Sequence, residues 1–181
     1  MAQSILSHLK SRHLNLELHR PILDEKNSIA TFLLYNLSGQ IVGYQQYNQN
    51  GDKKKYNSKE TGRYYTYKSK YQNTVVLWGT ESLYQSNGAI YLTEGIFDAA
   101  RMTNRGQSAL ASLANNPPRD YRNYLKLLNR PIIAVCDNDA AGRKLAKYGD
   151  YVEYVPSEYK DLGESPESYV SQLIEKYSHV Y

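Results

Sequence analysis

The chain has 181 residues, a length typical of one domain or of two small domains that share an interface. Hydrophobic residues make up 41% and charged residues 22% of it, so the chain can bury a core and is not a disordered tail. Its short apolar runs exclude a membrane-spanning helix, and no secretory signal opens the sequence. A single cysteine, Cys136, excludes a disulfide framework. Zinc is not expected either, because the usual ligand spacing is missing among Cys136, His8, His13 and His19.

Charge divides the sequence into two unlike halves. Residues 1–85 carry 11 Lys and Arg against 6 Asp and Glu, whereas residues 86–181 carry 11 against 12. A basic half joined to a carboxylate-bearing half suggests a surface that binds a polyanion beside a site that binds a cation. Solvated surfaces also differ in charge by chance. The 19 tyrosines are compatible with this interpretation, because tyrosine rings fill cores and also stack on bases.

The first part of the chain combines short helical turns with a hairpin. Residues 3–18 predict one or two helical turns, which Pro21 ends. From residue 29 the period becomes that of strands, and residues 29–35 and 40–47 flank an Asn-Leu-Ser-Gly turn signal. We expect an antiparallel hairpin there, and a short apolar strand or turn at residues 75–79.

A polar, basic and tyrosine-rich segment follows the hairpin over residues 52–70. It holds seven Lys and Arg against two acidic residues and has no helical period. Basic side chains bind phosphates and tyrosine rings stack on unpaired bases, so we expect single-stranded DNA to bind here. The basic candidates are Lys53, Lys54, Lys55, Lys59 and Arg63, and the stacking candidates are Tyr56, Tyr64, Tyr65 and Tyr67. A solvated loop would explain the charges but not the tyrosines between them.

The second half alternates strands with helices, which is the pattern of an α/β sheet. A weak linker over residues 85–88 separates the two halves, and we expect a basic N-terminal subdomain at 1–86 and a second domain at 87–181. The expected strands cover residues 89–93, 108–112, 131–136 and 150–155, and the expected helices cover residues 96–104, 117–128, 140–147 and 165–176. Right-handed crossovers would make a parallel sheet with helices on both faces.

Acidic residues follow three of these strands. They are Glu94 and Asp98 after the first strand, Asp137 and Asp139 after the third, and Asp161 after the fourth. Ligands bind outside the carboxyl ends of parallel strands, so we expect the carboxylates at one edge of the sheet. Plainer explanations exist, because acids favour the first turn of a helix and Asp139 can cap the helix after it. They leave Asp137, at the end of an apolar strand, unexplained.

The chemistry of this acidic set favours hard, oxygen-binding cations over zinc, since no His or Cys lies among the carboxylates. Neighbouring carboxylates repel each other, and bound Mg²⁺ or Mn²⁺ relieves that repulsion. Such a cage is typical of phosphoryl and nucleotidyl transfer, in which metals stabilise the attacking and the leaving oxygen.

The acidic motifs resemble a known domain. Glu94 with Asp98 after one strand, and Asp-x-Asp-x-x-Gly-Arg from Asp137 after another, are similar to the TOPRIM domain of topoisomerases, bacterial-type primases and some nucleases. Lys160 and Asp161, followed by Glu164, resemble the third acidic motif of the primases.

The segment ahead of these motifs is similar to bacterial and phage primases in particular. It has the strand-Gly-strand hairpin around residues 32–44, Lys-Tyr-Asn-Ser-Lys-Glu-Thr at 55–61 and Val-Leu-Trp-Gly at 76–79, in that order. The resemblance extends over about residues 29–170, and the ordered set is more specific than any one motif.

The resemblance implies an α/β primase core that makes short RNA primers from NTPs on single-stranded DNA. It makes Glu94 an essential, metal-associated glutamate that assists proton transfer, and Asp137 and Asp139 the ligands of Mg²⁺ or Mn²⁺. Asp98 and Asp161 would complete the metal site. The basic segment would hold template or nucleotide phosphates through Lys55 and Asn57.

The sequence also departs from the family. It lacks the usual zinc-binding module, carries Tyr47 where an arginine is common, and has Gly163 where the third motif often has an acid. We therefore expect a minimal, phage- or plasmid-encoded core, cytoplasmic in a bacterial cell or infected host, that works with a helicase or a separate zinc-bearing replication protein. Two alternatives stay open: a TOPRIM nuclease, and a catalytically degenerate module that binds nucleic acid or a replication protein.

Overall fold

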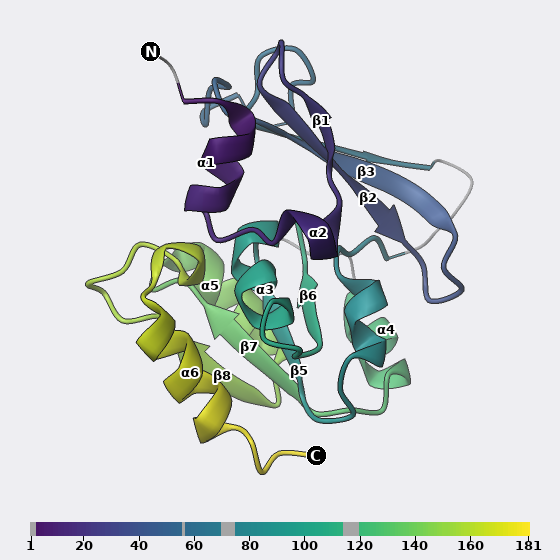
Figure 1. Cartoon of the computed structure of the whole chain (residues 1–181). Coiled ribbons are helices and arrows are strands. Elements are labelled where there is room, and N and C mark those ends of the chain that lie inside the picture. The colour runs from purple at the N-terminus through teal and green to yellow at the C-terminus, as the bar shows by residue number, and fades with distance from the viewer. Residues whose placement is uncertain (1–2, 56, 70–74, 114–119) are drawn as a thin grey trace.

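Two four-stranded sheets, one antiparallel and one parallel, form the molecule (Figure 1). The computed structural model describes residues 3–55, 57–69, 75–113 and 120–181. None of the helices in these ranges is long and apolar enough to cross a membrane.

The antiparallel sheet follows two short helices, α1 (Ile5–Ser11) and α2 (Leu16–His19), which confirm the helical turns expected at the start of the chain. Its strands lie in the order β1 (Ile22–Asp24), β2 (Ile29–Tyr35), β3 (Ile41–Asn48) and β4 (Tyr64–Lys68). The β2–β3 hairpin confirms the prediction. The sequence did not predict β4, because the strand is mostly exposed and lies in a polar, basic segment without apolar alternation.

The parallel sheet has the strand order β6-β5-β7-β8. Its strands are β5 (Ile90–Thr93), β6 (Ala109–Ala111), β7 (Ile132–Cys136) and β8 (Tyr151–Tyr154). The helices are α3 (Ile96–Thr103), α4 (Tyr121–Leu127), α5 (Ala140–Leu145) and α6 (Glu167–Lys176), with 3₁₀ turns at η1 (Thr80–Tyr84), η2 (Ala146–Tyr148) and η3 (Leu162–Glu164). This arrangement confirms the predicted α/β class. Of the helix expected at 117–128, residues 117–119 lie outside the described residues. At residues 75–79 the described backbone forms only a single bridge, from Trp78 to Ala111.

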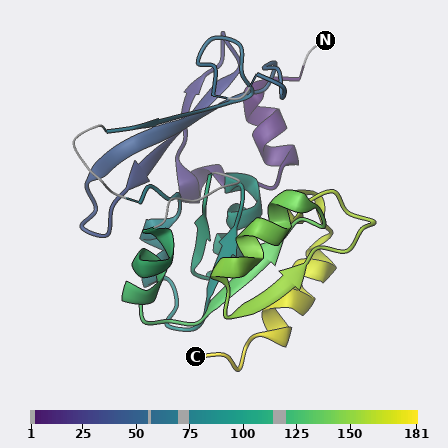
Figure 2. The ribbon, with the colours of Figure 1, turned by 180° about the vertical axis from the view of Figure 1, so that it is seen from behind.

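Helices cover both faces of the parallel sheet because its central strands are apolar on both sides. In β7, Ile133 and Val135 join the core beneath α3 and α6, whereas Ile132 and Ala134 join the core beneath α4 and α5. Figure 2 shows α4 and α5 in front of the sheet when the molecule is seen from behind. Side chains alternate along a strand, so one continuous apolar run serves both layers.

The larger core also joins the two sheets. It contains Leu9 of α1, Phe32 of β2 and Phe97 of α3, and the rings of Phe32 and Phe97 meet edge to face at 6.4 Å. The antiparallel sheet is therefore held against the carboxyl ends of the parallel strands by shared apolar packing. The domain boundary between residues 86 and 87 stays a prediction.

Candidate active site

A cavity of about 200 Å³ opens where the two sheets meet. Its floor is the carboxyl edge of the parallel sheet, between the neighbouring central strands β5 and β7. After β5 the chain continues to the outer strand β6, and after β7 it continues to the outer strand β8 on the opposite side of the sheet. Such a switch point is where open α/β sheets bind ligands. The lining residues are Gln45, Asn57, Tyr64, Thr66, Glu94, Gly95, Asp98, Leu113, Asp137 and Asp161.

Four of the five predicted acidic residues line this cavity. Glu94 follows β5, Asp98 lies in the first turn of α3, Asp137 follows β7 and Asp161 caps η3. They come from three segments that are far apart in the chain. The prediction that the strand ends would gather carboxylates at one edge agrees with their placement here.

Asp139 is the fifth predicted residue, and it does not line the cavity. Its Oδ1 accepts the Gly142 N–H at 2.9 Å, which is the helix-capping contact that the plainer interpretation expected. The backbone leaves no room at Gly142, where a Cβ would lie 1.9 Å from the carbonyl oxygen of Asp137. This close approach explains why glycine follows the two aspartates.

The carboxylates perturb one another. Burial, followed by repulsion from Asp161 and Asp137, raises the pKa of Asp98 to about 7. Burial and the charges of Asp161 and Glu94 raise the pKa of Asp137 to about 6. The pKa of Glu94 is raised by burial, then by Asp139 and Asp98. Perturbed carboxylates that face one cavity are typical of a site that binds a cation or moves a proton.

A tight turn fixes the third acidic motif against α3. The Gly163 N–H donates to Asp98 Oδ1 at 2.8 Å, and Asp161 Oδ1 accepts the Glu164 N–H at 2.9 Å. A Cβ at Gly163 would lie 3.2 Å from side-chain atoms of Arg12, Asp161 and Asp98. The glycine that departs from the family pattern therefore occupies a position where a side chain would crowd the site.

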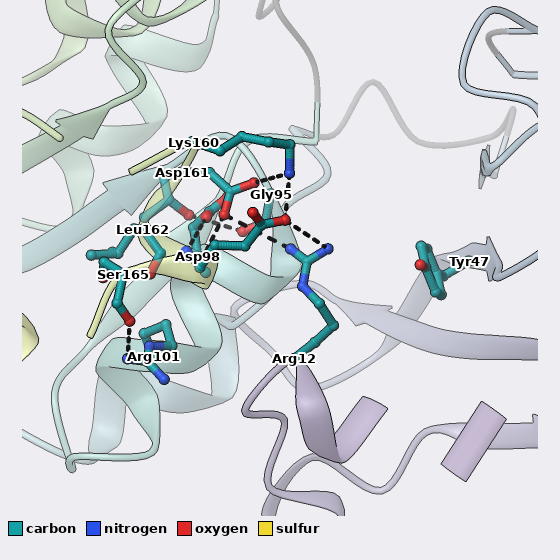
Figure 3. Close-up of polar contacts among 12 residues, drawn as sticks. Arg12, Tyr47, Gly95, Asp98, Arg101, Lys160, Asp161, Leu162 and Ser165 are labelled. Atoms are coloured by element: carbon teal, nitrogen blue, oxygen red, sulfur yellow. Dashed lines mark hydrogen bonds and ion pairs between the residues drawn. The ribbon is translucent and has the colours of Figure 1, made fainter. Parts of the chain in front are cut away.

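Buried Arg101 anchors the same turn from below. Its guanidinium donates to the Ser165 carbonyl at 2.7 Å (Figure 3). It also pairs with Glu167 at 2.9 Å. These contacts tie α3 to the start of α6, and they hold the loop that carries Asp161 in place.

Two cations, Lys160 of the motif itself and Arg12 from another segment, reach the carboxylates of the third motif (Figure 3). Lys160 Nζ lies 3.0 Å from Asp161 and 2.6 Å from Glu164. Burial opposes the charge on Lys160, but the bonds to Glu164 and Asp161 outweigh it and raise the pKa of Lys160. Arg12, which follows α1, lies 3.9 Å from both carboxylates and packs over the ring of Phe97.

Tyr47, which stands where the family commonly has an arginine, is turned into the core. Its hydroxyl lies 2.7 Å from His8 Nε2, and its ring packs on Phe97. Tyr47 therefore packs in the core, whereas Arg12, in the N-terminal segment, places a guanidinium near Asp161 and Glu164.

The structure divides the tyrosine-rich segment between two faces of the antiparallel sheet. Tyr64 and Thr66 of β4 line the cavity, whereas Tyr67 stacks on Tyr44 with ring centroids 5.3 Å apart. Tyr65 lies beside Tyr44 on that same outer face, at 6.2 Å. Tyr56 lies outside the described residues. The alternation of β4 decides this division, because neighbouring side chains of a strand point to opposite faces.

None of the basic candidates is among the described residues that line the cavity, whereas Asn57 from the same segment does line it. Asn57 adopts a left-handed conformation (φ 55°), and its Oδ1 accepts the Thr66 N–H at 2.8 Å. Arg63 is half-buried and donates from Nε to the Gly51 carbonyl. The lysines are exposed and do not line the cavity; they are Lys53, Lys54, Lys55 and Lys59.

Arg12, Gln45 and Leu113 belong to the site but were not predicted. Gln45 is buried in β3 and donates to Thr66 at 2.8 Å, and Leu113 follows β6. The alternation of β3 gives a signal for Gln45, because it places a glutamine on the apolar face. Nothing local marks Arg12, since its position depends on how α1 packs.

The donor chemistry of the cavity fits a divalent metal ion, because its acidic groups are all carboxylates and they raise one another's pKa. Within the described ranges, no three His, Cys, Asp or Glu side chains are grouped so that they could hold a metal as they stand. Metal ligation by Glu94, Asp98, Asp137, Asp139 and Asp161 remains a prediction. Cys136 lies buried at the end of β7, in the core on the other face of the sheet from His8 and its neighbours.

Comparison with solved structures identifies the fold. The DnaG catalytic core superposes with a TM-score of 0.65 at 16% identity, covering 96% of this chain and 73% of that one. The primase fragment of the bacteriophage T7 primase-helicase protein gives a TM-score of 0.62 at 16% identity, covering 94% of this chain and 73% of that fragment. The RNA polymerase domain of Mycobacterium tuberculosis primase DnaG, solved with double-stranded DNA, gives a TM-score of 0.64 at 16% identity. The superposition covers 94% of this chain and 63% of that domain.

No family model and no curated protein matches the sequence. The likeness therefore lies in the structure. The chain has the fold of the DnaG-type primase catalytic core, in which a parallel sheet flanked by helices follows an antiparallel sheet.

Proposed function

We propose that this chain is a metal-dependent primase core, a nucleotidyltransferase that joins ribonucleotides into short RNA primers on single-stranded DNA. The observation that carries the proposal is the cavity itself. Carboxylates from three chain segments face one another there, and the opposite wall is the antiparallel sheet that carries the basic segment. The likeness to primase cores, one of them solved with single-stranded DNA, supports the same function.

Glu94, Asp137 and Asp139 are the proposed ligands of Mg²⁺ or Mn²⁺, with Asp98 and Asp161 beside them. When bound, such ions lower the pKa of the attacking 3′-hydroxyl and stabilise the leaving pyrophosphate. We propose that Glu94, which lines the cavity, accepts the proton of that hydroxyl. Arg12 and Lys160 are the cations that a polyphosphate would meet at the rim of the cavity.

The basic segment is the proposed path of the template. Lys53, Lys54, Lys55 and Lys59 are exposed and close to Asn57 in sequence, so a strand held by them passes beside the cavity. Their contacts would be to phosphates, which hold a strand without reading its sequence. We infer that a helicase or a zinc-bearing replication protein supplies the choice of start site.

The test is primer synthesis. The protein is incubated with single-stranded DNA, labelled NTPs and Mn²⁺, with the Asp137→Asn/Asp139→Asn variant in parallel. We expect short RNA products from the parent and a loss of at least about 10³-fold in the variant, because the metal-binding carboxylates are neutralised. Shortened DNA in place of RNA would indicate the nuclease alternative instead. If the parent yields neither product, with or without a zinc-bearing primase partner, the proposal is wrong.

One observation favours a module that binds without catalysis. Asp161 and Glu164 already pair with Lys160 and Arg12, so the carboxylates of the third acidic motif are occupied by the protein's own cations. Calorimetry with Mn²⁺ distinguishes the two functions. Metal binding that disappears in the Asp137→Asn/Asp139→Asn variant supports the enzyme, and binding that is equal in both proteins supports the module.

A further inference from the structure

The amino end of the parallel sheet carries a second charged cavity, of about 270 Å³, far from the acidic edge. Its cations come from three places: Arg122 and Lys126 of α4, Arg130 before β7, and Lys147 of η2. Asp150 is its one acidic lining residue. We call this cavity, with these five residues, the basic pocket.

The positive charge of the basic pocket is not neutralised by the protein. Within the part of the chain that the structure describes, none of its four cations forms an ion pair with a carboxylate. Asp150 is engaged elsewhere, since its Oδ2 accepts the backbone N–H of Ile132 at 2.9 Å. Cations that converge on a concave surface attract anions more strongly than cations spread over a flat one.

Two of the cations are held by backbone carbonyls, so the pocket is partly preorganised. Arg130 donates to Gly88 at 2.7 Å and to Leu83 at 3.0 Å, and Arg122 donates to the carbonyl of Lys147. These contacts hold the two arginine side chains in place as walls of the basic pocket. They leave the ammonium groups of Lys126 and Lys147, both on exposed residues, to meet a ligand.

An exposed aromatic ring lies next to these charges. A more open cavity of about 420 Å³ shares Lys126, Arg130 and Asp150 with the basic pocket and adds Tyr151. Tyr151 is 45% exposed, whereas Tyr148 lines the basic pocket and meets Tyr121 edge to face. Cations beside an exposed ring match a ligand that has both a phosphate and a base.

We propose that the basic pocket binds the phosphate of a nucleotide unit, at the end of the parallel sheet opposite the acidic cavity. The unit is either a free nucleoside polyphosphate or part of a nucleic-acid strand, and both present the same phosphate oxygens to Lys126 and Lys147. This site lies outside the proposed primer-synthesis machinery. Its binding needs no metal.

The test follows single amide signals by NMR, with the full chain in EDTA so that metal-dependent binding at the acidic cavity does not contribute. Inorganic pyrophosphate, ATP and a single-stranded oligonucleotide without a terminal phosphate are titrated separately. We expect saturable shifts of the Lys126, Lys147 and Gly149 signals. If ATP shifts these signals and the oligonucleotide does not, the ligand is a free nucleotide. If the oligonucleotide shifts them, the ligand is a nucleic-acid strand.

The variant Lys126→Gln/Lys147→Gln weakens binding about tenfold, since two charge-assisted contacts are lost. The arginines are left in place because their backbone bonds support the fold. Lys10→Gln/Lys26→Gln removes the same charge from exposed sites elsewhere and leaves the affinity within about twofold. The proposal is overturned if the two double variants weaken binding equally. It is also overturned if only pyrophosphate shifts these amide signals, or if no probe shifts them. Loss of primer synthesis bears only on the acidic cavity.

Discussion

The two ends of the parallel sheet carry opposite charges in physically different ways. At the carboxyl end, the acidic groups stand on short side chains that the strand ends and a tight turn hold together, and the pKa of Asp98 rises to about 7. At the amino end, the cations stand on long side chains whose tips reach solvent. Short side chains cannot move apart, whereas long ones can. Changes at the acidic end should therefore alter the stability of the fold, and changes at the basic surfaces should alter binding.

The largest effect is expected at Gly142. In Gly142→Ala the new Cβ would collide with the carbonyl of Asp137, so the free energy of unfolding should fall by about 2–3 kcal/mol. This outcome would run against helix propensity, which favours alanine over glycine. Urea denaturation measures it. Gly88→Ala is the control, because its Cβ would lie 3.7 Å from the nearest atom, and it should stay within about 0.5 kcal/mol of the parent.

Neutralising Asp98, in contrast to filling the space at Gly142, should raise the stability of the fold. Asp98→Asn removes repulsion from Asp161 and Asp137 and still accepts the Gly163 N–H, so stability at pH 8 should rise by about 1–2 kcal/mol. Primer synthesis should fall at the same time. Thermal unfolding at pH 8 measures the gain, and Asp120→Asn, on an exposed residue, should not reproduce it. A less stable Asp98→Asn would mean that repulsion is not stored at this edge.

The pH dependence of stability follows from the same groups. Asp98 and Asp137 have folded pKa values of about 7 and about 6, above the ordinary 3.8, so the folded state binds more protons than the unfolded state between about pH 4 and 7. Their contribution favours folding at low pH and is lost as the pH rises through 6 and 7. We expect a loss of about 2–3 kcal/mol between pH 5.5 and 8, restored by Mn²⁺. The Asp98→Asn/Asp137→Asn variant should show a flatter profile, and an equal profile would contradict the assignment.

The smallest effect on stability is expected in the basic segment. Lys53→Ala/Lys54→Ala/Lys55→Ala should leave the free energy of unfolding within about 0.5 kcal/mol, because these side chains are exposed. The log–log salt slope of single-stranded DNA binding should become shallower by about 2, since three phosphate contacts are lost.

Fluorescence anisotropy at several salt concentrations measures that slope. The control Lys10→Ala/Lys26→Ala/Lys144→Ala removes the same charge elsewhere on the surface. An unchanged slope in the Lys53–Lys55 variant would remove this segment from the proposed template path.

The sequence by itself determined the parallel sheet and most of its acidic edge. Apolar runs set the strands, and the residue after each strand is fixed at that edge by the chain direction alone. Glu94 and Asp137 were therefore predictable from neighbours within a few positions. The capping role of Asp139 was likewise a local property, because the bond to Gly142 spans three residues.

Only the tertiary structure decided what lies opposite that edge. Asn57 and Tyr64 reach the cavity, and Arg12 reaches Asp161, because apolar side chains of α1 and β2 pack on α3. No local pattern encodes an approach between segments so far apart. The same holds for the basic pocket, whose cations come from a helix, a loop and a 3₁₀ turn. Local preferences act over a few residues, whereas shared burial of apolar surface joins distant ones.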